Sequence, residues 1–266
     1  MSIRTTLIGV LMGGVVLAGC AVQGQVDPRA GGRLAPPPVE YSSLVTHPDR
    51  PAEDFADDPA RLPAKVLEFA GLTYGMTIVE IEAGNGYYTE LMAHAIGPEG
   101  RVFMQNPLAF DNVFGDAIAK RLDGRLRNVQ AMRTNFDELT VADNSADLVT
   151  WFLGPHKLWF RPGGAPAEVF GNPDKAFAEI ARVLKPGAVF VAMDHVAAAG
   201  TLPETGSDAF RIDPAIVKDH AKRAGLELVE TSDLFANPED DYSVSAFDPE
   251  VRLKTDRFIF KFRKPG

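Results

Sequence analysis

The chain has 266 residues, of which 45% are hydrophobic and 24% are charged, a balance typical of a globular protein with one ordinary α/β domain. Its formal net charge is −9 at pH 7 and it has no basic run, so we expect no binding of nucleic acid or of an anionic membrane through charge. The single cysteine, Cys20, excludes an internal disulfide and a cysteine nucleophile in the body of the protein.

Residues 1–19 indicate an export signal. Arg4 gives a positive start, and residues 7–17 form an apolar run shorter than the roughly 20 residues that a membrane-spanning helix needs. The sequence LAGC at 17–20 resembles the lipobox of bacterial lipoproteins, in which the cysteine is lipidated and becomes the mature N-terminus; a plain cleaved signal is the alternative. The resemblance implies a protein of the cell envelope, on the periplasmic face and with the outer membrane favoured, which meets the membrane only through the lipid on Cys20.

Residues 20–45 are interpreted as the lipidated cysteine and a flexible tether, because this stretch is rich in proline and glycine and has too few apolar residues for a core. The globular domain is expected over residues 46–266. Near its start, Asp54, Asp57 and Asp58 are interpreted as a solvated acidic cluster before the first helix.

The domain alternates predicted strands with predicted helices. Strands are expected at 77–81, 100–105, 129–133, 146–152, 188–193, 226–231 and 257–262. Helices are expected at 63–70, directly after residue 86, from Pro173 to a stop at Gly187, and from Pro214 to a stop at Gly225. This alternation predicts a mostly parallel sheet with helices on both faces.

Three stretches carry a family signature. VEIEAGNG at 79–86 forms a glycine-rich turn between a strand and a helix, where the backbone can approach a ligand and the helix N-terminus offers free N–H groups. TNFDEL at 134–139 precedes the fourth strand, and AEIARVLKPG at 178–187 precedes the fifth. In this order and spacing they resemble the class I S-adenosylmethionine-dependent methyltransferases. The resemblance implies a Rossmann-like, doubly wound, mostly parallel seven-stranded sheet whose last strand is antiparallel.

The resemblance also implies a cofactor, S-adenosylmethionine, and the residues that would bind it. These are Glu80, Gly84, Asn85, Gly86, Tyr87, Asn106, Asn135, Phe136 and Asp137. Two positions depart from the family pattern. Glu82 replaces the first glycine of the loop, where its charge would repel the carboxylate of the cofactor unless a cation compensates. Asn106 replaces the carboxylate that accepts hydrogen bonds from both ribose hydroxyls, and an amide offers one oxygen instead.

Candidate catalytic residues follow the fourth and fifth strands, at the carboxyl edge where ligands bind. We expect His156 or His195 to act as a base that removes a proton from the methyl acceptor, with Asp194 orienting it. Packing or loop-capping roles for these residues are the alternative. No tight ligand spacing supports a metal site.

The leading functional hypothesis is a methyltransferase that acts on a small molecule or on an envelope component. A non-catalytic binding module is the alternative, because the cofactor has no obvious supply outside the cytoplasm and a fold does not fix a function. A dinucleotide-dependent dehydrogenase is a weaker hypothesis, since Thr89 stands where the dinucleotide-binding motif has its third glycine.

Overall fold

The computed structural model describes residues 38–165 and 168–266. The predicted signal and Cys20 lie outside the described residues. Residues assigned to the end of the tether form helix α1 (Tyr41–Val45). Leu44 of α1 is buried, and the hydroxyl of Tyr41 donates to the carbonyl of Leu72 at 3.2 Å, so the folded part begins slightly earlier than the sequence predicts.

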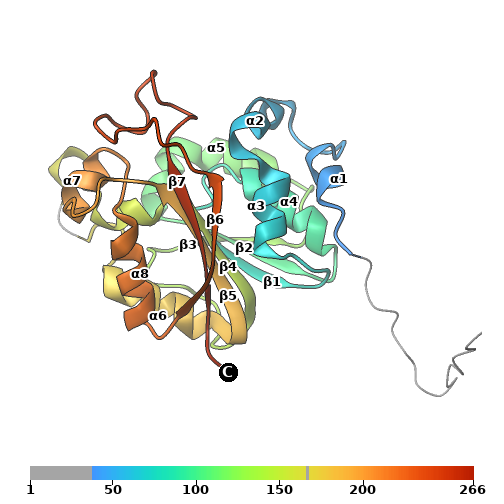
Figure 1. Cartoon of the computed structure of the whole chain (residues 1–266). Helices are drawn as coiled ribbons and strands as arrows, with labels where there is room; N and C mark the ends of the chain where they lie inside the picture. The colour runs from blue at the N-terminus through green and yellow to red at the C-terminus, as the bar shows by residue number, and fades with distance from the viewer. Residues whose placement is uncertain (1–37, 166–167) are drawn as a thin grey trace, which may run out of the picture. The chain divides into compact units, whose positions relative to one another are not determined.

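One seven-stranded sheet organises the domain, with strand order β3-β2-β1-β4-β5-β7-β6 (Figure 1). The strands are β1 (Thr77–Ile81), β2 (Arg101–Asn106), β3 (Val129–Arg133), β4 (Ala146–Phe152), β5 (Leu184–His195), β6 (Glu227–Phe235) and β7 (Arg257–Arg263). The pairs from β3 to β5 are parallel, whereas β7 runs antiparallel to both β5 and β6. The predicted fold class, including the antiparallel last strand, is confirmed.

Helices lie on both faces of the sheet (Figure 1). The α-helices after α1 are α2 (Asp58–Arg61), α3 (Pro63–Ala70), α4 (Tyr87–Ile96), α5 (Asp111–Leu122), α6 (Pro173–Val183), α7 (Pro203–Asp208) and α8 (Pro214–Arg223). The short 3-10 helices are η1 (Ala52–Ala56), η2 (Leu108–Phe110), η3 (Pro155–Trp159) and η4 (Pro162–Gly164). Buried residues of α1, α3 and α4 pack on one face, and those of α6 and α8 pack on the other.

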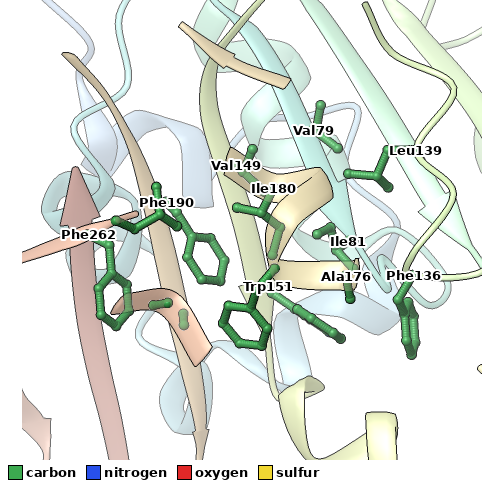
Figure 2. Packing of buried hydrophobic residues seen from close by; sticks show 14 of the residues in the cluster. Val79, Ile81, Phe136, Leu139, Val149, Trp151, Ala176, Ile180, Phe190 and Phe262 are labelled. Atoms are coloured by element: carbon green, nitrogen blue, oxygen red, sulfur yellow. The ribbon is translucent and has the colours of Figure 1, made fainter. Parts of the chain in front are cut away.

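Alternation along the strands divides the core between these two faces. In β1, Ile78 faces α3 and α4, whereas Val79 and Ile81 face α6 and α8. Figure 2 shows the second cluster, where Trp151 lies beside Phe136 with their ring centroids 4.9 Å apart. The phenylalanines at period two in β7 join this same cluster, so the reason for predicting that strand was sound.

Several element boundaries differ from the prediction, among them the end of β6 at Phe235 and the junction of α6 with β5. Helix α6 begins as expected, with the side chain of Asn172 capping the N–H of Lys175 at 3.0 Å, but it ends at Val183. Gly187, with φ +81°, instead turns the chain within the irregular start of β5. Helix α5 was not predicted at all, because it contains Gly115 and buries only Ile118 and Arg121.

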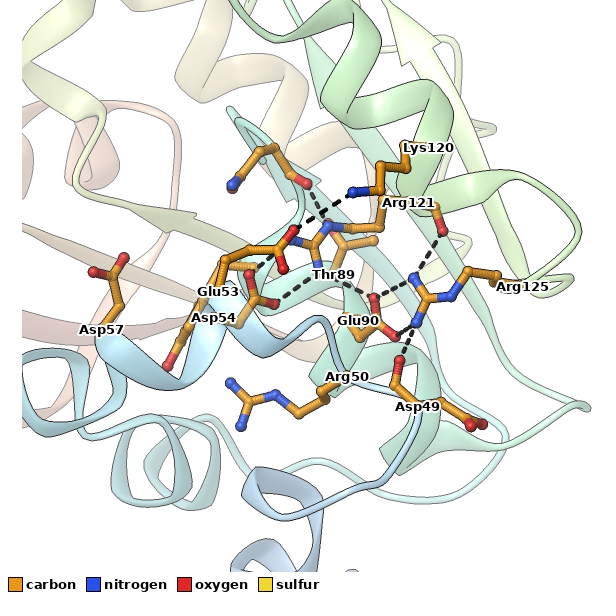
Figure 3. Close-up of polar contacts among 12 residues, drawn as sticks. Asp49, Arg50, Glu53, Asp54, Asp57, Thr89, Glu90, Lys120, Arg121 and Arg125 are labelled. Carbon is orange, nitrogen blue, oxygen red and sulfur yellow. Dashed lines mark hydrogen bonds and ion pairs between the residues drawn. The ribbon is translucent and has the colours of Figure 1, made fainter.

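The acidic cluster before the first helix is not solvated as a whole, and this interpretation is wrong for Asp54. Asp54 is 4% exposed and forms two hydrogen bonds of 2.9 Å with the guanidinium of Arg121 on α5 (Figure 3). Arg121 also contacts Glu90 of α4 at 3.0 Å, and Glu90 in turn binds Arg125. Burial would raise the pKa of Glu90, but His94 and the two arginines outweigh it and hold this pKa at about 2. These ion pairs fix the segment before α2 against α4 and α5.

Candidate functional site

A cavity of about 330 Å³ lies at the carboxyl ends of β1, β4 and β5, beside the start of β7. Its walls come from the glycine-rich loop after β1, from α2 and α4, and from the loop before β7. This is the edge at which a doubly wound sheet binds ligands. The candidate catalytic residues were expected at this same edge from the sequence.

The glycine-rich loop lines the cavity through its backbone. Gly84 and Gly86 have φ values of +58° and +87°, a region that favours glycine. The amide of Asn106 holds this loop: its oxygen accepts from the N–H of Gly84 at 2.8 Å, and its nitrogen donates to the carbonyl of Gly84 at 3.0 Å. A carboxylate could not make the second bond, so an asparagine here has a structural use in bracing the loop. On the other side, Arg121 donates to the carbonyl of Asn85.

Glu80 ends β1 with a buried side chain that lines the cavity. The hydroxyl of Thr89 donates to its carboxyl group. Burial raises the pKa of Glu80 to about 8, although the Thr89 bond and Arg121 both act to lower it. Glu80 therefore holds its proton at neutral pH when no ligand is bound.

Glu82, the departure in the loop, has φ +54°, which lies in the left-handed region that favours glycine. Its carboxylate accepts from the ammonium of Lys157 and, at 3.1 Å, from the indole N–H of Trp151. Burial raises its pKa, while Lys157 and His156 lower it. Lys157 thus supplies the compensating cation that the sequence analysis required. Gly154 leaves room for this arrangement, because a Cβ there would lie 2.0 Å from a carboxylate oxygen of Glu82.

His156, which lines the cavity, forms a buried pair with Asp194 behind it. Nδ1 of His156 lies 2.9 Å and 3.0 Å from the two carboxylate oxygens of Asp194, and the backbone N–H of His156 donates to the same group at 2.8 Å. Burial would raise the pKa of Asp194, but the two histidines and these hydrogen bonds lower it below its ordinary value. Because the carboxylate accepts the proton at Nδ1, the lone pair of a neutral His156 is at Nε2. Nε2 is buried and has no hydrogen-bond partner among the described residues, which leaves it free for a ligand.

His195 lines the same cavity but has a different partner. Its backbone N–H donates to Asp194 at 2.8 Å, whereas Nδ1 of its ring lies 2.7 Å from the hydroxyl of Thr255. Burial lowers the pKa of His195 to about 3; Asp194 opposes this shift, and His156 and Arg257 add to it. Of the two predicted bases, the structure therefore orients His156 with the carboxylate and keeps His195 neutral.

The other predicted cofactor residues divide into two groups. Tyr87 lines the cavity, and its hydroxyl donates to Asp58. Asn135, Phe136 and Asp137 lie away from the cavity: the ring of Phe136 is in the core, and Asp137 accepts from the backbone N–H of Asn172 at 2.9 Å. The structure brings the glycine loop, Tyr87 and the His156–Asp194 pair together, and it leaves the adenine-side residues outside this cavity.

Two site residues were not identified as such from the sequence. Lys157 neutralises Glu82, and Arg257 lines the cavity. Lys157 could have been suspected from its place beside His156. Arg257 could have been noticed because it is a cation at the start of a predicted strand that is rich in phenylalanine.

Two negative findings hold for the residues that the structure describes. No group of three or more histidine, cysteine, aspartate or glutamate side chains is arranged to hold a metal ion. No helix in this part of the chain has both the length and the apolar character needed to cross a membrane.

Residues 79–192 match the family described as "Methyltransferase domain". A ubiquinone/menaquinone biosynthesis C-methyltransferase of Hydrogenovibrio crunogenus is 30% identical over 129 residues, which are 48% of this chain and 45% of that protein. Another from Idiomarina loihiensis is 27% identical over 127 residues, 46% of this chain and 43% of that protein. The chain thus spans less than half the length of these relatives.

Solved structures of methyltransferases share the fold. An S-adenosylmethionine-dependent methyltransferase from Aquifex aeolicus superposes with a TM-score of 0.55 at 20% identity, covering 85% of this chain and 98% of the other. Phosphoethanolamine N-methyltransferase 2 of Haemonchus contortus, solved with S-adenosylmethionine, gives 0.54 at 17% identity, covering 86% of this chain and 60% of the other. The matched segment contains the glycine loop, β4 and most of β5, so residues 79–192 are similar to a methyltransferase domain, and the solved structures share the fold of the chain.

Proposed function

We propose that the protein transfers a methyl group from S-adenosylmethionine to a hydroxyl or amine of a small acceptor, with His156 as the base. One observation carries the proposal. His156 lines the same cavity as the glycine loop; its Nε2 has no hydrogen-bond partner among the described residues, and its Nδ1 is backed by Asp194. This arrangement is that of a general base with an orienting carboxylate.

The described residues fit the cofactor on the glycine-loop side. The backbone of Gly84 and Asn85 faces the cavity, and a Cβ built on Gly84 meets nothing within 4 Å. The protonated carboxyl of Glu80 and the guanidinium of Arg61 are the groups there that could hold the ammonium and carboxylate of the cofactor. When bound, S-adenosylmethionine supplies an electrophilic methyl group.

The protein's part in the chemistry is to place the acceptor and take its proton. A hydroxyl or amine hydrogen-bonded to Nε2 of His156 gives up its proton to that nitrogen as it becomes methylated. Asp194, buried and ionised, stabilises the imidazolium that results. Neutral His195 adds no second positive charge beside it.

The site of action is proposed from the leader. The LAGC sequence at 17–20 supports attachment to the periplasmic face of the envelope through Cys20, so the acceptor would be a small molecule or an envelope component. Labelling of cells with a radioactive fatty acid, for the wild type and Cys20→Ala, tests this: label on the wild type alone supports the anchor, and label on neither contradicts it.

Calorimetry on the purified full-length chain tests the function. We expect S-adenosylmethionine and S-adenosylhomocysteine to bind with micromolar affinity, and Tm to rise on binding as linkage requires. No detectable binding of either ligand to a folded protein would refute the proposal and favour the non-catalytic binding module.

Once an acceptor is found by screening, His156→Gln and His195→Gln separate the two histidines. We expect His156→Gln to lower kcat by about 10² to 10⁴, the usual contribution of a general base, with little change in cofactor affinity. His195→Gln should have a smaller effect on kcat. Equal losses in both variants would contradict the assignment of His156 as the base.

A further inference from the structure

Arg257 is a buried cation that no carboxylate neutralises among the described residues. Its side chain, at the start of β7, is 6% exposed and lines the cavity. Nη2 donates to the carbonyl of Ala60 at 3.0 Å, and the guanidinium carbon lies 3.7 Å from the centroid of the Phe235 ring. In the described part of the chain no carboxylate pairs with Arg257, and its Nε has no partner. A carbonyl and an aromatic face offset only part of the cost of burying a guanidinium.

The acidic residues of the cavity do not neutralise Arg257. Asp57 pairs with Arg61 at 2.9 Å, and Glu82 pairs with Lys157. Glu80 keeps its proton at neutral pH, because its pKa is raised to about 8. Burial lowers the pKa of Arg257 to about 10, with Tyr88 opposing and Arg61 adding to the shift, so the guanidinium is still charged at pH 7.

We propose that Arg257 binds an anion in the cavity and that it holds a carboxylate or phosphate group of the methyl acceptor. This assignment rests on the proposed function. Both the acceptor and the carboxylate of the cofactor could supply the anion. The backbone of Arg257 is paired with that of His195, and β4 and β5 lie between β7 and β1, whose glycine loop would hold the cofactor, which favours the acceptor. The guanidinium itself reaches the carbonyl of Ala60 on α2.

The rest of the cavity wall indicates what carries the anion. Phe114, Phe152 and Leu153 line the cavity, and the exposed side chains of Phe247 and Leu253 lie at its margin. Aromatic and aliphatic walls beside the guanidinium of Arg257 suit an aromatic acid. The acceptor class is therefore an aromatic carboxylic acid or aryl phosphate that also bears a hydroxyl or amine for His156.

Calorimetry with benzoate and with benzamide, its neutral isostere, tests the anion site on the full-length chain. The variants are Arg257→Met, Arg257→Lys and, as a matched control, Arg263→Met, which changes an exposed arginine of the same strand outside the cavity. We expect the wild type and Arg263→Met to bind benzoate about tenfold more tightly than benzamide. Arg257→Met should lose this preference, and Arg257→Lys should keep part of it. Equal binding of the two probes to the wild type, or an undiminished benzoate preference in Arg257→Met, would overturn the proposal.

A second pair of ligands identifies the source of the anion. S-adenosylhomocysteine carries the amino-acid carboxylate of the cofactor, and methylthioadenosine lacks it. If Arg257→Met binds S-adenosylhomocysteine within about twofold of the wild type, the anion belongs to the acceptor. A tenfold loss confined to S-adenosylhomocysteine would assign Arg257 to the cofactor and overturn our assignment.

The two proposals fail separately in these experiments. If the wild type binds neither nucleoside but prefers benzoate through Arg257, the methyltransferase function fails and the anion site stands. Urea unfolding of each variant shows whether it is folded. Should Arg257→Met not fold, Arg257→Lys carries the test, since it keeps the charge and loses the planar two-pronged contact: a weakened benzoate preference supports the site, and an unchanged preference overturns it.

Discussion

Replacing Lys157 with methionine should destabilise the protein strongly, because it removes the cation that neutralises Glu82. The Glu82 side chain is only 5% exposed, and without Lys157 its carboxylate would keep a single side-chain donor, the indole N–H of Trp151. Breaking a buried ion pair from one side typically costs about 3–5 kcal/mol, a large part of the stability of an ordinary domain. The loss should be smaller at low pH, because a proton on Glu82 removes the unpaired charge.

Urea unfolding at pH 5 and pH 8 measures this effect in the wild type, Lys157→Met and the double variant Glu82→Gln/Lys157→Met. The pKa of Glu82, already raised by burial, rises further in Lys157→Met, so stability is present at low pH and is lost as the pH rises through that pKa. The double variant should recover most of the loss at pH 8. Lys120→Met, which removes an 84% exposed lysine 4.0 Å from Glu53, is the control and should change stability by less than about 1 kcal/mol. A loss at pH 8 as small as that of the control, or a double variant no more stable than Lys157→Met, would refute this reasoning.

Three further substitutions test other features. Gly154→Ala should lower Tm through a loss of about 1–3 kcal/mol, because its Cβ would lie 2.0 Å from a Glu82 oxygen and 2.3 Å from the Trp151 indole nitrogen; an unchanged Tm would show that the loop yields freely. Glu80→Gln should flatten the pH dependence of the free energy of unfolding. In the wild type, protonated Glu80 contributes stability that is fully present below its ordinary pKa of 4.5, and this contribution is lost at about 1.4 kcal/mol per pH unit as the pH rises towards 8. Equal slopes in the two proteins, measured by urea unfolding from pH 5 to pH 9, would contradict the raised pKa. Phe177→Ala should cost about 3–5 kcal/mol of unfolding free energy in urea, because it empties a fully buried position of the core, and a loss below 1 kcal/mol would mean that the core collapses around it.

The strands and the glycine loop were predictable because their signals are local. The period-two pattern of apolar residues and the glycine turn at 84–86 depend only on residues that are neighbours in sequence. These local patterns are enough to locate β1 and β7 along the chain. The proximity of His156 to Asp194 was also predictable, since the two residues lie at the carboxyl ends of adjacent parallel strands, and these ends meet at one edge of a sheet. Which histidine bonds the carboxylate depends on ring orientation, and no spacing encodes it.

The remaining features depend on contacts between distant segments. From the sequence, Asp54 is interpreted as a solvated acid, but in the structure it pairs with Arg121, 67 residues later. Glu82 is interpreted as an obstacle to a ligand, but Lys157, 75 residues later, neutralises it. The amide of Asn106 is interpreted as a weak ribose contact, but its oxygen and nitrogen both bond the backbone of Gly84. In each case the sequence shows the chemical group, and only the fold shows its partner.

The position of β7 has a consequence for how the protein is assembled during synthesis. This strand is made after all the others, yet it lies inside the sheet, between β5 and β6. Until it leaves the ribosome, β5 presents a bare edge that can pair with another chain, and β6 has no strand to join. Arg257 is the first residue of the same strand, so β5 gains its second neighbour and the binding cavity gains this wall in a single late event. A chain released early would therefore lack both this cavity wall and the partner of β5, and would be exposed to aggregation before it could bind a ligand.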